Sequence, residues 1–324
     1  MVFAARATLV SSFTQPPAVP VGPLQTGLAV SGILLPTVHV VSYLSSYPTP
    51  KLVLFIVLPI TNMLSFGINN VLLAFAGAVL PLLSASPHPL LGNGIPLRIM
   101  PLGASITYGL GSSDWNGYRA ALRSLLLTST PRAAAVNMVG SLHNGTMIDN
   151  DVEGWSGFRI TQVHEKAMNT SDKAVLYWKP NLVLINAGTN DAAQGYQIPS
   201  AGWRMESMMR DIWEASPRAT ILLSTLLVNK NPTTDKHVLE INEQYVRLAT
   251  RLREVAGRPV VLVDMHGEDG PGYEDIPDGT HPTDEGYVMM ARLWYRGVVE
   301  ASHAGFLQAP EVVEGVPDDG DVRV

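Results

Sequence analysis

The sequence predicts an α/β domain built on a doubly wound parallel β-sheet, and two observations carry this prediction. From residue 97 onward, apolar runs of strand length alternate with amphipathic stretches of helical length. The runs are mostly apolar and do not alternate with polar residues, which is typical of parallel strands buried on both faces. Right-handed helical crossovers between such strands place helices on both sides of one sheet. We expect this domain to cover residues 95–306, with an acidic, flexible tail over residues 307–324.

Five apolar runs are the candidate strands. They cover residues 97–102, 134–139, 182–186, 220–227 and 260–264. The clearest helix lies before the last run, where apolar residues recur with a 3-4-3-4-3 spacing that marks one buried helix face. These residues are Val238, Ile241, Tyr245, Leu248, Leu252 and Val255. We expect the helix to end at Gly257, and another helix to run from Asp284 toward Val298. Ligands of such sheets bind beyond the carboxyl ends of the strands.

Composition narrows the class of protein. The chain has 324 residues, a formal net charge of −6 and no cysteine. This length is typical of one or two domains, and the C-terminal two-thirds alone can bury a large core. An acidic chain without clusters of Lys and Arg argues against nucleic acid as a partner. The absence of cysteine excludes disulfides, thiolate catalysis and Cys-ligated zinc.

The first 95 residues differ from the rest in being rich in apolar residues and poor in charge. Residues 52–83 are almost wholly apolar and long enough for a membrane span. From Met63, however, a short polar start, an apolar run and small residues follow one another as in a secretory signal. We therefore expect residues 1–62 to be an over-extended gene model and residues 63–86 to be a signal peptide of a secreted protein. A retained membrane anchor through residues 52–83 is the alternative, and only then is a membrane a partner.

A serine follows the first predicted strand in a glycine-bearing turn. Residues 101–109 read Pro-Leu-Gly-Ala-Ser-Ile-Thr-Tyr-Gly, so the hydroxyl of Ser105 can be exposed at the end of the sheet where ligands bind. Thr107 stands where the Gly-x-Ser-x-Gly elbow of α/β-hydrolases has its last glycine, so this turn is not that elbow. Taken alone, the segment also fits an ordinary serine-rich turn.

A histidine with an acid three residues before it is the second candidate feature. Residues 278–282 read Asp-Gly-Thr-His-Pro, and of the eight histidines only His281 has such an acid within a loop shaped by Gly and Pro. A serine hydroxyl is a poor nucleophile until a base accepts its proton, and that base must be held in one tautomer. Local geometry lets Asp278 bond the far ring nitrogen of His281. We therefore expect His281 to be the base and Asp278 its support.

Two further strands end in residues that could stabilise negative charge. The run over residues 182–186 is followed by Ala-Gly-Thr-Asn-Asp, which delivers Asn190 to the same end of the sheet as Ser105. An asparagine amide can donate to the oxyanion of acyl transfer, although Asn190 would also suit a turn or a helix cap. The backbone N–H of Gly140, after residues 134–139, is a second candidate donor, and a simple turn is its alternative.

Four blocks in this order resemble the SGNH/GDSL hydrolase family over residues 97–300. They are Gly-Ala-Ser-Ile-Thr, Val-Gly-Ser, Gly-Thr-Asn-Asp and Asp-Gly-Thr-His-Pro. The resemblance implies a flavodoxin-like three-layer α/β/α sandwich with a five-stranded parallel sheet in the order 2-1-3-4-5. It implies that Ser105 is the nucleophile and that Asp278 and His281 complete the triad. It further implies an oxyanion hole of Gly140, Asn190 and the Ser105 amide, with no cofactor and no metal.

Two more segments resemble a fungal branch related to acetyl-xylan esterases of carbohydrate esterase family three. They are residues 117–119, Gly-Tyr-Arg, and residues 153–157, Glu-Gly-Trp-Ser-Gly. Val152 stands where that branch often has histidine, and Ala104 stands where the family name implies aspartate. We expect Ala104 to alter the turn without removing activity. Ser156 lacks a preceding strand signal, so we do not expect it to be the nucleophile.

Together these features predict a secreted esterase that hydrolyses short acyl esters, with acetyl groups on plant-wall polysaccharide as the expected substrate. A lipid esterase or lysophospholipase is the alternative among enzymes. A non-catalytic carbohydrate-binding relative is the alternative outside them, favoured by Ala104 and by the altered segment at Glu153. Two sequons, at Asn144 and Asn169, permit N-glycosylation in the secretory route.

Overall fold

The computed structural model describes residues 39–44, 52–57, 89–169, 171 and 174–321. The chain divides into two compact units, Met1–Ala85 and Ser86–Val324. In the first unit, strand β1 (His39–Leu44) pairs antiparallel with strand β2 (Leu52–Val57).

Most of the N-terminal predictions fall on residues that the structure does not describe. The signal segment, residues 63–86, lies wholly outside the described residues, and so does most of the extension over residues 1–62. The alternative anchor over residues 52–83 begins in strand β2, and its remainder is not described. No helix within the described ranges is long and apolar enough to cross a membrane.

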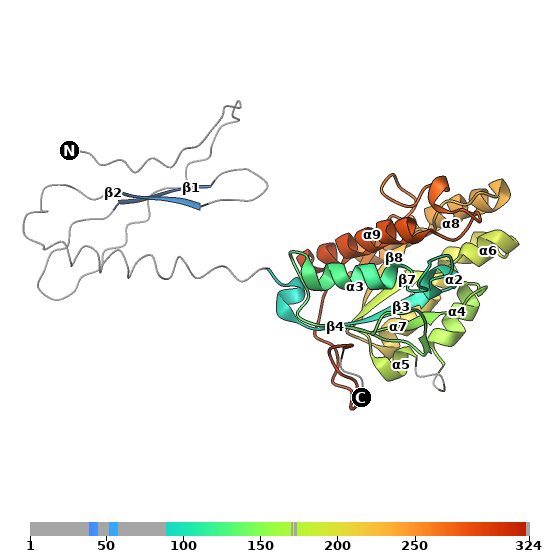
Figure 1. The fold of residues 1–324 in the computed structure, drawn as a ribbon, viewed down its shortest axis with the longest axis horizontal. Helices are drawn as coiled ribbons and strands as arrows, with labels where there is room; N and C mark the ends of the chain where they lie inside the picture. The colour runs from blue at the N-terminus through green and yellow to red at the C-terminus, as the bar shows by residue number, and fades with distance from the viewer. Residues whose placement is uncertain (1–38, 45–51, 58–88, 170, 172–173, 322–324) are drawn as a thin grey trace, which may run out of the picture. The chain divides into compact units, whose positions relative to one another are not determined.

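The second unit is built on a seven-stranded sheet that is parallel except at one edge (Figure 1). Its strands are β3 (Leu97–Gly103), β4 (Val136–Met138), β5 (Leu142–His143), β6 (Asp151–Gly154), β7 (Leu182–Asn186), β8 (Thr220–Ser224) and β9 (Val260–Val263). Strands β3, β7 and β8 are buried at every residue, which agrees with their mostly apolar sequences. The predicted α/β fold with a mostly parallel sheet is confirmed.

The strand count differs from the prediction at one edge of the sheet. The five predicted strands correspond to β4, β3, β7, β8 and β9, which pair in that spatial order, the predicted 2-1-3-4-5. Two more strands join the edge beside β4, so the predicted number of five strands was wrong. Strand β6 pairs with the end of β3, and β5 pairs antiparallel with β6. Both are short and partly polar, so no apolar run marks them in the sequence.

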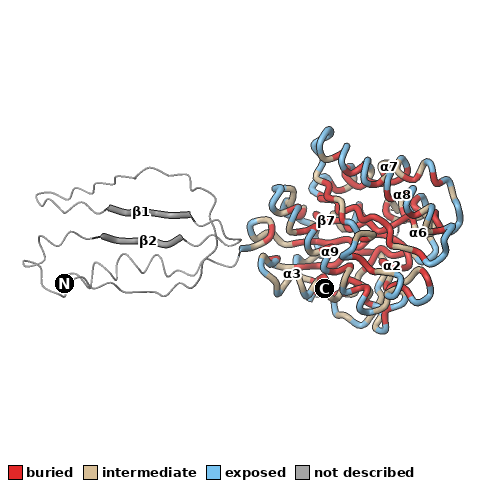
Figure 2. Tube along the Cα trace, turned by 90° about the horizontal axis from the view of Figure 1, so that it is seen from above, coloured by how far each residue is buried: buried red, intermediate tan, exposed pale blue. Residues whose placement is uncertain are grey.

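Helices cover both faces of the sheet, and the two cores alternate along each strand. Helices α3 (Tyr118–Thr128) and α9 (Asp284–His303) lie side by side on one face (Figure 1). On the other face lie α4 (Ile160–Ala167), α5 (Val175–Trp178), α7 (Ala201–Ala215) and α8 (Pro232–Thr250). Leu97 and Ile99 of β3 enter the first core, whereas Met100 and Leu102 enter the second. Figure 2 shows the buried strands between helices whose outer sides are exposed.

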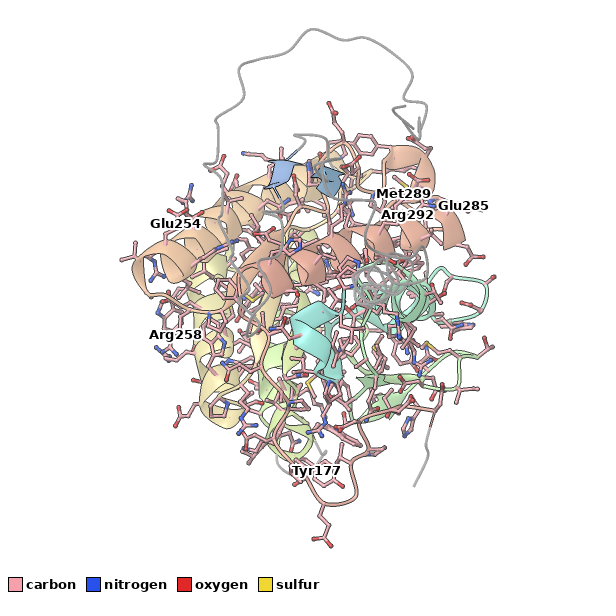
Figure 3. The ribbon with its side chains drawn as sticks, turned by 90° about the vertical axis from the view of Figure 1, so that its left-hand side faces the viewer. Tyr177, Glu254, Arg258, Glu285, Met289 and Arg292 are labelled. Carbon is pink, nitrogen blue, oxygen red and sulfur yellow. The ribbon has the colours of Figure 1, made fainter. Side chains whose placement is uncertain are left out.

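The two longest helices, α8 and α9, each begin where a side chain caps them. The side chain of Asn231 accepts bonds from two amides in the first turn of α8, and Pro232 follows at the first helical position. Helix α8 gives way at Arg251 to a π-helical turn, and Val255 is 83% exposed, so its predicted place on the buried face was wrong. On α9, the side chain of Thr283 caps the start, and Glu285, Met289 and Arg292 lie along the outward side (Figure 3).

The C-terminal segment packs on the domain, so the prediction of a loose tail is wrong for the part that the structure describes. The side-chain amide of Asn137 donates to the Pro317 carbonyl at 2.6 Å, and the Gly320 amide donates to the Val136 carbonyl at 3.0 Å. Acidic composition alone suggested disorder, but in these bonds the C-terminal segment uses its own backbone groups, and their partners lie on β4.

Asp149 lies beneath this C-terminal segment in a mostly buried position. Its Oδ2 atom accepts bonds from the Met138 amide and the Arg123 guanidinium, both at 2.9 Å. Burial raises the pKa of Asp149 to about 6, in spite of the opposing effect of these two bonds. The carboxylate of Asp319 also pairs with Arg123, but it is half exposed.

This raised pKa predicts a pH dependence of stability. Between the model-peptide value of 3.8 and about 6, the folded chain holds a proton at Asp149 that the unfolded chain has released. Stability therefore falls as pH rises through this window. We expect the wild type to lose about 3 kcal/mol of unfolding free energy here that Asp149→Asn does not lose.

Urea unfolding at several pH values from about 4 to about 7 measures this difference. Asp319→Asn is the matched control, because it removes an exposed carboxylate from the same arginine, and it should follow the wild type. Parallel stability curves for the wild type and Asp149→Asn would contradict the prediction.

Candidate active site

Ser105 is the first residue of a short helix that starts where the central strand ends. Strand β3 stops at Gly103, and helix α2 (Ser105–Tyr108) begins after Ala104. The residue is 9% exposed, and its Oγ atom lies 2.8 Å from Nε2 of His281. The first amides of a helix have no partner within it, so the Ser105 N–H is available to a ligand.

His281 and Asp278 lie in the loop before α9 and form the rest of this hydrogen-bonded chain. The Nδ1 atom of His281 lies 2.7 Å from Oδ2 of Asp278. The other carboxylate oxygen, Oδ1, accepts bonds from the amides of His281 at 2.7 Å and Thr280 at 2.9 Å. Partial burial raises the pKa of Asp278, but these bonds from His281 and Thr280 outweigh it and hold the pKa below its usual value.

The three side chains make an arrangement suited to activating a nucleophile. An ionised Asp278 holds a proton on Nδ1 of His281, which leaves Nε2 to accept the proton of Ser105. The structure thus brings together the predicted Ser105, His281 and Asp278. Ser156 lies in an exposed turn after β6, whereas His281 bonds Ser105. Across the described part of the chain, no three His, Asp or Glu side chains form a candidate metal site.

Asn190 and Gly140 follow strands that flank β3. Asn190 lies in the first turn of α6 (Thr189–Gln194), directly after β7, and its Nδ2 atom donates to the Phe158 carbonyl at 3.0 Å. An amide group carries two N–H donors, so this bond orients the group and leaves a second donor for a ligand. Gly140 follows β4 and packs against the backbone of Val152 on β6. Both residues therefore lie at the carboxyl ends of strands next to Ser105.

The loop from Gly109 to Gly117 joins the two halves of this site, and sequence analysis missed it. The Ser113 amide and hydroxyl donate to the Asp284 carboxylate at 2.9 and 2.6 Å, and these bonds lower the pKa of Asp284. The Tyr287 hydroxyl donates to the Leu110 carbonyl at 2.6 Å. The loop that leaves Ser105 is thereby fixed to the start of α9, beside His281. Asp284 had the sequence signature of a helix start only, so no local signal pointed to Ser113.

Trp115 is an exposed aromatic residue on this loop. It is 45% exposed and has a φ of 61°, a conformation that is rare for a bulky side chain. Its carbonyl accepts bonds from Arg119 at 3.0 Å and from Asn144 at 3.2 Å, which hold the backbone in place. Its ring meets the ring of Tyr108 edge-on, at 6.5 Å between centroids. The side-chain nitrogen of the Asn144 sequon thus serves as a hydrogen-bond donor in this loop.

Glu153 is the first residue of the Glu-Gly-Trp-Ser-Gly segment, and no sequence pattern assigned it a role. It is wholly buried on β6 and accepts bonds from Ser141 and from the indole of Trp155. A carboxylate between apolar and glycine residues is a signal that could have marked it, because buried charges need partners. Val152, where the related branch often has histidine, is buried in the same strand, and Ala104 leaves α2 without a side-chain cap.

The position of Gly111 predicts that a side chain added at this point of the loop would displace His281. Gly111 has a φ of +97°, and an added Cβ would lie 2.7 Å from the Pro282 carbonyl oxygen and 3.0 Å from Cβ of His281. We expect Gly111→Ala to displace His281 and to lower kcat on the order of 10²-fold, the cost of a misplacement near 1 Å.

Gly305→Ala is the matched control, because Gly305 also has a positive φ but has nothing within 4 Å of an added Cβ. Steady-state kinetics on an aryl ester, with thermal unfolding of each variant, measures both effects. Equal kcat values in the two variants would contradict the proposed contact.

Comparisons with known proteins agree with the fold. Residues 102–289 match the GDSL-like Lipase/Acylhydrolase family. A family 3 carbohydrate esterase from Clostridium thermocellum shares the fold with a TM-score of 0.55 and 24% identity, over 64% of this chain and 98% of that one. A family 3 carbohydrate esterase from Talaromyces cellulolyticus does so with a TM-score of 0.53 and 22% identity, over 64% and 99%.

One curated relative is a multidomain esterase of Ruminococcus flavefaciens. It is 26% identical over 264 residues, which are 74% of this chain and 32% of the relative. This chain therefore spans about a third of that protein's length. Since the family match covers more than half of the present chain, the chain belongs to the GDSL-like lipase/acylhydrolase family.

Proposed function

We propose that this protein is a serine esterase that removes short acyl groups, above all acetyl, through an acyl-enzyme. The observation that carries the proposal is the hydrogen-bonded chain from Ser105 Oγ to His281 at 2.8 Å and on to Asp278 at 2.7 Å. A hydroxyl, an imidazole and a carboxylate in this order form the arrangement that converts serine into a nucleophile.

In the first half of the proposed reaction, Ser105 Oγ attacks the ester carbonyl while Nε2 of His281 takes its proton. The carbonyl oxygen becomes negatively charged and accepts bonds from the Ser105 amide, the Gly140 amide and the Asn190 side chain. Collapse of this intermediate breaks the ester bond. The alcohol leaves with the proton from His281, and the acyl group stays on Ser105.

In the second half, a water molecule takes the place of the alcohol. His281 accepts a proton from the water, which attacks the acyl carbon, and the same three donors hold the oxyanion. The carboxylic acid leaves as the proton returns to Ser105 Oγ. Asp278 stays ionised throughout, orienting His281 and stabilising its cationic form.

For the substrate, we propose acetyl esters on a plant-wall polysaccharide. Two observations support this choice. Family 3 carbohydrate esterases share the fold, and this chain exposes the indole of Trp115. A flat aromatic ring that is rigidly held beside helix α2, which begins with Ser105, can stack on a sugar ring. A lipid esterase would act fastest on long-chain esters, and a non-catalytic carbohydrate-binding relative would hydrolyse none.

Placement in the fungal acetyl-xylan esterase branch and secretion through residues 63–86 are parts of the same proposal. Both fit a polysaccharide substrate, which lies outside the cell. Sequencing the N-terminus of the mature protein tests secretion: a start near Ser86 supports signal cleavage, and retention of residues 52–83 overturns it.

The role of Ser105 predicts the effect of removing its hydroxyl. We expect Ser105→Ala to lower kcat/KM on 4-nitrophenyl acetate by at least about 10³-fold, because no acyl-enzyme can form. Thermal unfolding checks that the variant is folded, and a fluorophosphonate probe should label the wild type but not Ser105→Ala. Ser156→Ala is the matched control and should keep wild-type activity and labelling. Full activity of Ser105→Ala would refute the nucleophile.

The position of Trp115 predicts a split between small and polymeric substrates. We expect Trp115→Ala to raise KM for acetylated xylo-oligosaccharides about tenfold, the loss of roughly one stacking interaction. Its KM for 4-nitrophenyl acetate should stay unchanged, because that ester has no sugar. Trp203→Ala, which removes a more exposed tryptophan on helix α7, is the matched control. An equal rise in KM for both substrates would exclude a sugar contact.

A further inference from the structure

Glu153 is a fully buried carboxylate on the strand that pairs with the end of β3, and the mechanism above makes no use of it. It lies on β6 between Val152 and Gly154. Its Oε2 atom accepts a bond from the Ser141 amide at 2.8 Å. Its Oε1 atom accepts bonds from the Ser141 hydroxyl at 3.0 Å and from Nε1 of Trp155 at 2.7 Å.

Two of these bonds fix the residue that follows Gly140. On the other side of Gly140, the Val139 amide donates to the Ile99 carbonyl of β3 at 2.8 Å. Gly140 therefore lies between two anchors, one on β3 and one on Glu153. A side chain at this position could not fix the backbone instead, since an added Cβ on Gly140 would lie 2.3 Å from the carbonyl carbon of Val152.

We propose that Glu153 is the positioning residue of the oxyanion hole. By holding Ser141, it sets the backbone angles of Gly140 and so the direction of the Gly140 N–H. This inference rests on the proposed function, in which the Gly140 amide donates to the oxyanion. Preorganised donors stabilise the oxyanion because they need no reorganisation during the reaction.

A carboxylate suits this task better than a neutral acceptor. It accepts on both oxygens, so it binds the amide and the hydroxyl of Ser141 together and still accepts from Trp155. Breaking any of these bonds would leave a buried polar group with fewer partners, which is costly. The interaction is therefore stiff, and stiffness is what an oxyanion donor on a glycine requires.

The side-chain amide of glutamine gives a discriminating variant. In Glu153→Gln, the carbonyl oxygen can face the Ser141 amide only if the NH2 group faces the Ser141 hydroxyl and the Trp155 indole. The hydroxyl can accept from NH2, but the indole N–H cannot. We therefore expect Glu153→Gln to lower kcat on 4-nitrophenyl acetate about tenfold at near-constant KM, by misdirecting one donor.

Adding Trp155→Phe removes the conflicting indole donor. The double variant Glu153→Gln/Trp155→Phe should therefore recover kcat to within about twofold of Trp155→Phe alone, a coupling expected only for residues in contact. A role in packing alone predicts the opposite, a double variant at least as impaired as Glu153→Gln. Ser141→Ala, which keeps the amide and loses only the hydroxyl, is the mild control.

Glu153→Leu removes both acceptor oxygens and should lower kcat about 10²-fold, with KM little changed. If thermal unfolding shows that this variant does not fold, the test rests on Glu153→Gln and on the double variant Glu153→Gln/Trp155→Phe. Affinity for an alkyl boronic acid, which forms a tetrahedral adduct on Ser105, should fall in parallel with kcat. An unchanged kcat and affinity in both Glu153 variants would overturn the inference.

Ser105→Ala, measured alongside, separates this inference from the proposed function. If Ser105→Ala keeps full activity, the proposed function fails, whatever Glu153 does. If Ser105→Ala is inactive while the Glu153 variants match the wild type, only the positioning role fails.

Discussion

The site depends on how closely the end of β3 is held between its two neighbours. Gly103 pairs with Gly154 of β6 on one side and with Asn186 of β7 on the other. A side chain does not fit there, because a Cβ would lie 2.2 Å from the Asn186 carbonyl oxygen. Parallel strands in register end at the same edge of a sheet. The close approach of β3, β6 and β7 therefore places Ser105 and the residues after β6 and β7 next to one another.

A buried arginine holds the loops that surround the nucleophile. The Arg119 guanidinium donates to the carbonyls of Asn150, Trp115 and Asn144 at 2.9–3.1 Å and to that of Tyr108 at 3.3 Å. Burial lowers the pKa of this group, although nearby tyrosine and aspartate groups oppose the shift. A planar group with five donors can bind these four carbonyls at once, whereas a lysine ammonium has only three donors. The exposed Trp115 and the turn after Ser105 therefore share one support.

The base and its acid form a nearly self-contained unit. Asp278 bonds both the ring and the backbone of His281, and these contacts span only three residues. The Asp278 side chain is 56% exposed, against 16% for His281, so local bonds rather than burial hold the carboxylate. By contrast, 176 residues separate His281 from Ser105, so their contact depends on the whole sheet and on the loop fixed to α9.

Much of this fold could be predicted from local patterns. The apolar runs of β3, β7 and β8 predict buried parallel strands because few polar residues interrupt them, and the spacing on α8 predicts its buried face. Strands β5 and β6 escaped detection because their few residues pair through the backbone and carry polar side chains. The C-terminal segment was wrongly predicted as loose because its own backbone carbonyls and amides contact Arg98 of β3 and Val136 and Asn137 of β4. Backbone groups leave no mark in the composition of the segment.

For the site, the sequence by itself determined the chemical groups and the one local pair, Asp278 with His281, because three residues of loop suffice to join them. Only the tertiary structure decided that Ser105 meets His281, that Ser113 holds the start of α9 and that Glu153 holds Ser141. These contacts join segments far apart in the chain, and Glu153 lies beside Gly140 only because β6 pairs with the end of β3. Hydrogen bonds act over a few ångströms in space, whatever the separation in sequence.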